Sequence, residues 1–150
     1  MFEVDSRNIF IGDILKLNYG QMCPCDVLIL ATSEDINGKY ICWLDSLYDD
    51  GKCARDRKDA IALTKSFAHW ANEDRGLTYF LNRLNGKIVY KSNQDQITGS
   101  LKIKDDPKIE VFDDSKIIKR GCVMRSKYAL GLVLYNGKGC YRTDKNWFSF

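Results

Sequence analysis

Residues Ile9 to Ser33 read I-F-I-G-D-I-L-K-L-N-Y-G-Q-M-C-P-C-D-V-L-I-L-A-T-S, and this stretch decides the fold. It holds two apolar runs of strand length, both rich in Ile, Leu and Val. A polar turn that contains Gly20 and Pro24 separates them. Such a pattern is typical of two packed β-strands. The stretch therefore predicts the nucleus of a β domain.

Each of the two runs carries one carboxylate. Asp13 follows Gly12, and Asp26 follows Pro24 and Cys25. An acid beside Gly or Pro at the start of a strand usually accepts hydrogen bonds from nearby backbone N–H groups. Neither acid has a histidine or a second acid close by in the sequence, as proton transfer or metal binding would require. We therefore predict a structural role for both.

Length and composition indicate one globular domain of ordinary polarity. The chain has 150 residues, of which 45% are hydrophobic and 29% charged. No apolar run approaches the roughly 20 residues that cross a bilayer, and the start, M-F-E-V-D-S-R, does not resemble a secretory signal. The 23 basic and 20 acidic side chains are interspersed, which disfavours nucleic acid as a partner because nucleic acid requires a basic stripe.

The cysteine pattern favours free thiols over disulfides or zinc. The spacing Cys23-Pro-Cys25 is too tight for an ordinary bridge or a C-x-x-C zinc motif. The remaining cysteines are isolated and mostly lie in apolar runs, where a thiol behaves as a small hydrophobe. We expect reduced cysteines in a cytosolic compartment and no metal site. The six are Cys23, Cys25, Cys42, Cys53, Cys122 and Cys140.

Downstream of Ser33 the patterns alternate between strands and turns, with one change of period. Apolar positions recur at three and four between about 55 and 73, which predicts one amphipathic helix containing the single histidine, His69. A polar loop is expected over Asp45–Cys53. Strands are expected at 39–44, 78–81, 86–90, 108–112, 116–120, 121–125 and 128–135. The prediction is a mainly β fold, a distorted jelly roll or sandwich with one inserted helix.

No motif establishes a reaction by spacing alone. Asp45, Asp49 and Asp50 lack the D-x-D-x-D-G spacing of a calcium loop. The glycine-rich segment 138–142 lacks a phosphate-binding signature and opens no helix. One histidine is too few for a convincing Ser-His-Asp or Cys-His arrangement. The residues by themselves indicate a soluble β domain that binds something.

Four ordered blocks resemble the actuator domain of P-type ATPases, most closely the P4 type, the phospholipid flippases. They are I-G-D-I-L-K-L at 11–17, P-C-D-V-L-I-L at 24–30, L-N-G-K-I at 84–88, and K-R-G-C-V-M-R-S-K-Y-A-L-G-L-V-L-Y-N-G at 119–137. The family patterns are V-G-D-I, P-A-D, F-x-G, and L-R-G-x-x-L-R-N-T-x-x-x-G-V-V-x-Y-T-G. Cys25 replaces the usual Ala, and Ser126-Lys127 replaces N-T. The resemblance implies a cytosolic jelly-roll domain, residues 1–150, within a longer membrane protein.

The resemblance also implies a functional loop, D-G-E-T, whose Glu helps water attack an aspartyl-phosphate on another domain. The sequence departs from it. In one register Asp50-Gly51-Lys52-Cys53 replaces D-G-E-T, and in the other Asp50 stands at the Glu position. A protonated Lys has no lone pair to act as a general base, and an Asp reaches less far than a Glu. We therefore predict impaired or absent dephosphorylation at Asp50, Gly51, Lys52 and Cys53.

The resemblance places cofactors and partners outside this stretch. ATP and Mg²⁺ are implied for the whole protein and none for this domain. The implied partners are the phosphorylation and nucleotide-binding domains and the transmembrane helices of the same chain, with an accessory subunit as a further partner. A degenerate loop of this kind also resembles the ATPase-like region of apicomplexan and ciliate guanylyl cyclases, which implies a regulatory module without catalysis. The third reading is an unrelated β-sandwich binding domain.

Overall fold

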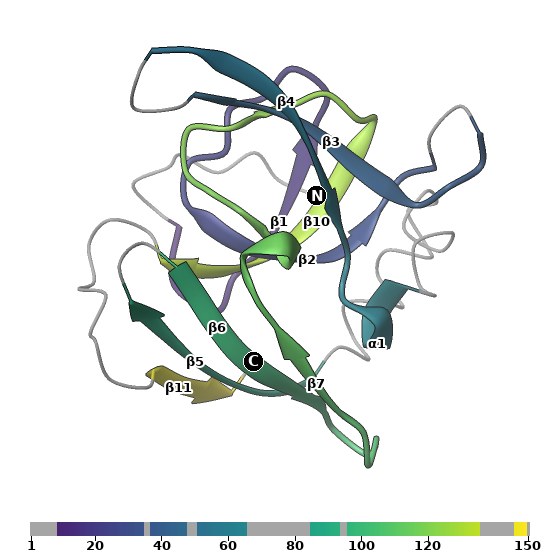
Figure 1. Cartoon of the computed structure of the whole chain (residues 1–150). Helices are drawn as coiled ribbons and strands as arrows, with labels where there is room; N and C mark the ends of the chain where they lie inside the picture. Colours follow the sequence, from purple (N-terminus) through teal and green to yellow (C-terminus); the bar gives the residue numbers. More distant parts are fainter. Residues whose placement is uncertain are drawn as a thin grey trace.

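The computed structural model describes residues 9–34, 37–47, 51–65, 85–93, 96–135 and 146–149. Three antiparallel sheets make up the fold (Figure 1). The first has the order β1-β10-β2-β8, with bounds Ile14–Asn18, Tyr128–Tyr135, Asp26–Thr32 and Ile117–Ile118. The second has the order β11-β5-β6-β7, with bounds Asn146–Ser149, Gly86–Asn93, Gln96–Ile103 and Ile109–Phe112. The third has the order β4-β3-β9, with bounds Cys53–Asp59, Ile41–Leu47 and Val123–Met124.

The first sheet lies between the other two and contributes side chains to both cores. Even-numbered residues of β2 and β10, such as Leu28 and Leu130, pack against the second sheet. Val27, Ile29 and Val133 pack against the third. Every residue of β2 is buried. Because both faces of this strand are buried, residues 27–31 are continuously apolar. A strand with one solvent-exposed face would alternate apolar and polar residues.

The mainly β prediction is confirmed, and so are most of the strands. β2, β5, β7 and β10 cover the apolar runs expected from the sequence. β7 also shows the alternating burial predicted for a half-buried strand. The short turn after it is a 3₁₀ turn, η3, Asp114–Lys116, which Asp113 caps by accepting the N–H of Ser115. Strands β6 and β11 were not among the expected strands.

The first strand begins later than its apolar run suggests. Residues 9–13 form a turn in which Gly12 has a φ of +94°. Asp13 closes this turn, because its carboxylate accepts the N–H of Phe10 at 2.8 Å. β1 then starts at Ile14. The predicted backbone-tying role of Asp13 is confirmed.

The predicted polar loop over Asp45–Cys53 is wrong at both ends. β3 continues to Leu47 and β4 starts at Cys53, and these two residues are register partners. An acid is tolerated inside β3 because Asp45 lies between two arginines, described below. Only residues 48–52 are left to connect the strands.

The predicted helix over about 55–73 is wrong at its start. Residues up to Asp59 belong to β4, which pairs with β3 along its full length. Its charged sequence suits a sheet edge, where polar side chains face water. The helix α1 spans Ala62–Lys65. The described residues do not include the rest of the predicted helix, His69 or the strand expected at 78–81.

No helix in the part of the chain that the structure describes has the length and hydropathy needed to cross a bilayer.

Candidate functional site

The β3–β4 hairpin carries the candidate loop at its tip and stands at one end of the molecule, over the central sheet (Figure 1). Gly51, Lys52 and Cys53 are exposed there. Gly51 has a φ of +81°, a left-handed conformation that glycine adopts at little cost. Asp50 lies outside the described residues. The hairpin therefore presents three of the four predicted site residues to solvent.

Asp45 joins this hairpin to the segment that follows β9. Its Oδ1 accepts from the Nε of Arg55, its register partner on β4, at 3.0 Å. Its Oδ2 accepts from the Nε of Arg125 at 2.6 Å. The Arg55 and Arg125 guanidinium groups hold the pKa of Asp45 below its ordinary value. Asp45 is thus an ionised bridge, and it is not available as the metal ligand considered from the sequence.

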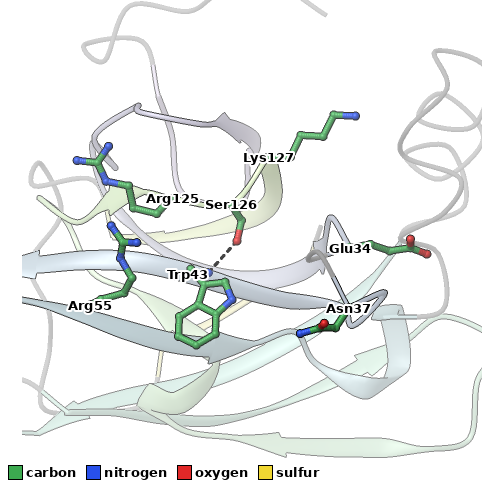
Figure 2. A pocket seen from close by; sticks show the side chains of 7 residues that line it. All are labelled: Glu34, Asn37, Trp43, Arg55, Arg125, Ser126 and Lys127. Atoms are coloured by element: carbon green, nitrogen blue, oxygen red, sulfur yellow. Dashed lines mark hydrogen bonds between the residues drawn. The ribbon is translucent and has the colours of Figure 1, made fainter.

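A pocket of about 570 Å³ opens beside this bridge (Figure 2). Arg55 and Arg125 project at one end of it, and Glu34 and Asn37 lie at the other. The Trp43 ring lies between the two ends. The residues that line the pocket are Glu34, Asn37, Trp43, Arg55, Arg125, Ser126 and Lys127.

Hydrogen bonds fix the wall of the pocket behind Trp43. The N–H of Trp43 donates to Ser126 Oγ at 2.8 Å, and Ser126 Oγ donates to the carbonyl of Ile41 at 3.3 Å. Arg125 also lies over the Tyr19 ring, 5.8 Å from its centroid. This cation–π contact adds a second restraint on the guanidinium.

The arginine end of the pocket suits an anion. Both arginines contact Asp45 through Nε. A guanidinium also carries terminal N–H donors that suit a carboxylate or phosphate. Lys127 adds a third cation at the rim. At the far end the Glu34 carboxylate already accepts the Tyr40 hydroxyl at 2.7 Å. The pocket is therefore polarised, with its positive end next to the hairpin.

Asp26 has the structural role that the sequence predicts. It is buried, with 6% of its surface exposed, and its Oδ1 accepts the N–H of Arg120 at 2.7 Å. The neighbouring N–H of Gly121 donates to the carbonyl of Cys23 at 2.9 Å. The P-C-D and K-R-G blocks, far apart in sequence, are therefore hydrogen-bonded to each other.

The cysteines are free thiols wherever the structure describes them. Cys23, Cys25, Cys42 and Cys122 are buried and Cys53 is exposed, while Cys140 lies outside the described residues. Burial raises the pKa of Cys42 to about 12, and contact with Cys25 together with burial raises that of Cys23. Protonated, buried thiols are poor nucleophiles and metal ligands. Among the described residues, no three His, Cys, Asp or Glu side chains gather as a metal site would require.

Sequence reasoning missed the pocket. Trp43, Arg55 and Arg125 come from three segments, and only the pairing of β3 with β4 and β9 brings them together. The one available signal was Asp45, an acid at the end of an apolar run. A carboxylate inside a strand of this kind predicts a cationic partner on a neighbouring segment. Asp49 and the segment 138–142 lie outside the described residues.

Comparison with known proteins gives related sequences over nearly the whole chain. A phospholipid-transporting ATPase of Schizosaccharomyces pombe is 30% identical over 156 residues, covering 96% of this chain and 11% of the ATPase. The phospholipid-transporting ATPase FetA of Mus musculus is 29% identical over 140 residues, covering 91% of this chain and 11% of the ATPase. A guanylate cyclase of Toxoplasma gondii is 27% identical over 144 residues, covering 93% of this chain and 3% of the cyclase. No protein-family model matches.

These relatives confirm the resemblance to P4-type phospholipid-transporting ATPases and to guanylate cyclases. The chain spans 11% of the length of the two ATPases, so it corresponds to one segment of a much longer protein in each.

Proposed function

We propose that this chain, which is homologous to one segment of the phospholipid-transporting ATPases, acts as the actuator domain of a P4-type ATPase-like membrane protein. In this role it couples changes in the ATP-handling domains to the transmembrane helices. The domain acts mechanically and has no turnover alone. Rigid-body motion of this kind needs a stiff scaffold with a projecting contact.

The observation that carries the proposal is the β3–β4 hairpin. Two strands paired along their length hold the exposed residues Gly51, Lys52 and Cys53 at the position where the resemblance puts the D-G-E-T loop. Behind the tip, Asp45 ties the hairpin to Arg125. A loop fixed on a rigid scaffold can reach into a second domain without losing its own conformation.

The backbone at Gly51 favours one of the two registers. A φ of +81° is ordinary for Gly but strained for a β-branched residue. The register that places Gly51 at the Thr position would put a β-branched residue at this φ in the relatives. The other register places Gly51 on Gly and Lys52 on Glu. We adopt that second register.

Lys52 then stands where the relatives' general base would be. An ammonium cannot accept a proton from the attacking water, and it exposes positive charge toward the phosphoryl group. Such a cation can bind the aspartyl-phosphate electrostatically without promoting its hydrolysis. We infer that this loop docks on the phosphoenzyme and slows its decay.

The remaining features of the proposal concern the whole protein. ATP and Mg²⁺ are held by other domains of the same chain, and the domain faces the cytosol. Its partners are the phosphorylation and nucleotide-binding domains, the transmembrane helices and an accessory subunit. The positive end of the pocket, at Arg55 and Arg125, provides a second docking point for a carboxylate of a neighbouring domain.

The test measures formation and decay of the phosphoenzyme in the full-length protein that carries this chain. Lys52→Glu restores a general base and is expected to speed decay by about a hundredfold. Asp50→Ala is expected to change decay little. Arg57→Glu is the matched control, because it makes the same charge change at an exposed position of β4 away from the tip.

Three results would count against the proposal. If Asp50→Ala slows decay and Lys52→Glu does not speed it, our register is wrong and Asp50 is the base. If neither change affects decay, this loop does not carry the site. If no phosphoenzyme forms in a folded, ATP-binding protein, the ATPase role is excluded.

The relation to guanylate cyclases supports a second candidate function. In that case the chain is a regulatory module of a bifunctional cyclase. The replacement of the D-G-E-T glutamate by Lys52 would then reflect the loss of aspartyl-phosphate hydrolysis. Absence of the phosphoenzyme together with a cyclase activity that changes in Lys52→Glu would select this function.

A further inference from the structure

The second sheet has an outer face that belongs to neither core. In β5, β6 and β7 the side chains alternate between the core and this face, as the register shows. Tyr90, Leu101 and Phe112 point inward and are buried. Their neighbours in sequence point outward. We call this outward surface the lysine face, because Lys87, Lys91 and Lys102 lie on it and are exposed.

The side chains that the structure describes on the lysine face are cationic or uncharged. Lys87 and Lys102 are register partners, so their ammonium groups lie on adjacent strands. Among the described side chains on this face there is no carboxylate. The β6–β7 turn at its border adds two lysines and two aspartates, Lys104, Asp105, Asp106 and Lys108, whose charges balance. The described side chains of the face therefore have a net positive charge.

Two large aliphatic side chains protrude from the same face. Ile109 is 64% exposed and Val111 is 77% exposed, although both are strand residues. Ile109 is the register partner of Lys102, and Val111 is the register partner of Ser100. Isoleucine and valine this exposed, side by side on one strand, indicate a surface that becomes covered.

We propose that the lysine face docks on an anionic phospholipid surface. Lysine ammonium groups at the ends of flexible stems are attracted by anionic headgroups, while Ile109 and Val111 insert shallowly between them. The combination of cations with protruding aliphatic side chains is what such an interface requires. A purely ionic partner would leave the two aliphatic residues in water.

A second copy of the chain fits this face less well. A symmetric contact would bring the lysines of one copy against those of the other, and like charges facing each other cost free energy. A bilayer with anionic lipids neutralises the lysines and covers the aliphatic side chains together.

The face is separated from the candidate loop. The β5–β6–β7 sheet and the β3–β4 hairpin lie at opposite ends of the molecule, with the central sheet between them (Figure 1). Docking through the lysine face would leave the hairpin tip and the pocket uncovered. The inference uses the proposed function only for the presence of a membrane nearby.

The experiment is flotation of the 150-residue chain with vesicles of phosphatidylcholine and phosphatidylserine, against vesicles of phosphatidylcholine alone. Binding is expected only with phosphatidylserine and is expected to fall as salt rises from about 0.1 M to about 1 M, since the Debye length shrinks from about 10 to about 3 Å. The pair Lys91→Gln and Lys102→Gln should weaken it roughly twenty-fivefold, at about fivefold for each lysine.

Two further variants separate the parts of the proposal. Ile109→Ser with Val111→Ser should weaken binding by about tenfold without changing the charge. Lys39→Gln with Arg57→Gln is the matched control: it removes as much charge from exposed positions outside the lysine face. This control should bind like the wild type. Circular dichroism of each variant checks that the fold is kept.

Several results would overturn the proposal. They are no vesicle binding by the folded wild-type chain, equal binding to phosphatidylcholine alone, and an equal loss in the Lys39/Arg57 control. Self-association without lipid that Ile109→Ser and Val111→Ser abolish would assign the face to a second copy. Vesicle binding and phosphoenzyme decay are separate readouts, so failure of this inference is distinguishable from failure of the proposed function.

Discussion

At the scale of single residues, Asp45 is the side chain on which the pocket depends. One carboxylate accepts from Arg55 and from Arg125, which come from different segments. It neutralises part of the charge that two neighbouring guanidinium groups would otherwise place side by side. The Asp45–Arg55 and Asp45–Arg125 ion pairs are partly exposed, and exposed ion pairs stabilise only weakly. The contribution of Asp45 to the free energy of unfolding is therefore best measured through its pH dependence.

We predict that Asp45→Asn destabilises the chain at pH 7 and that the difference from wild type shrinks in acid. The pKa of Asp45 is lowered in the folded state, first by Arg55 and then by Arg125. Its stabilising effect is therefore present above the unfolded pKa of about 3.9 and is lost as pH falls through the folded pKa. Urea midpoints at pH 7 and pH 3 measure this.

Asp105→Asn is the control for this prediction. Asp105 is exposed in the β6–β7 turn and has a φ of +66°, which asparagine also tolerates. Its midpoint should follow the wild type at both pH values. A pH-independent effect of Asp45→Asn, or an equal effect of Asp105→Asn, would contradict the assignment.

At the scale of elements, the close approach of β10 and β2 explains the glycine in Y-A-L-G-L-V-L-Y. A Cβ built on Gly131 would lie 2.6 Å from Val27 Cγ2 and 2.7 Å from Val27 Cβ. The register of the two strands also shifts at this point, between Leu130 and Gly131. The central sheet is therefore packed tightly here because this position lacks a side chain.

We predict that Gly131→Ala destabilises the chain by about 1–3 kcal/mol through overpacking. Val27→Ala removes the Cγ atoms and should recover part of this loss, so the two substitutions should be strongly non-additive. A double-mutant cycle in urea measures the coupling. Additive effects would mean that the strain at Gly131 does not come from Val27.

At the scale of the whole molecule, the second sheet is attached to the central sheet by one core and by a buried hydrogen bond. The Tyr90 hydroxyl on β5 donates to the Leu134 carbonyl on β10 at 2.5 Å. Tyr90 is 3% exposed, and burial raises its pKa to about 12. This bond holds the sheet that carries the lysine face to the central sheet.

We predict that Tyr90→Phe costs about 1–2 kcal/mol, because the carbonyl loses this donor in the core. The folded pKa lies above the unfolded value of about 10, so the contribution of Tyr90 is complete below pH 10 and is lost as pH rises to about 12. Urea unfolding measured against pH should therefore show a shallower alkaline decline in the variant.

Tyr128, whose pKa burial also raises to about 12, stays in this variant and should preserve part of the alkaline decline. An unchanged decline in Tyr90→Phe would contradict the assignment.

The sequence by itself determined the mainly β class, most strands, the structural roles of Asp13 and Asp26, and the relation to phospholipid-transporting ATPases. These depend on local patterns: apolar run length, turn residues and ordered motifs, which are written along the chain.

Only the tertiary structure decided that Cys53–Asp59 is a strand, that Asp45 bridges two arginines, and that one sheet face collects lysines. The period of three and four predicted a helix from about residue 55, but pairing with β3 satisfies the backbone of β4 up to Asp59 and determines its conformation. Pairing partners lie far apart in sequence, and no local pattern encodes which strands become neighbours.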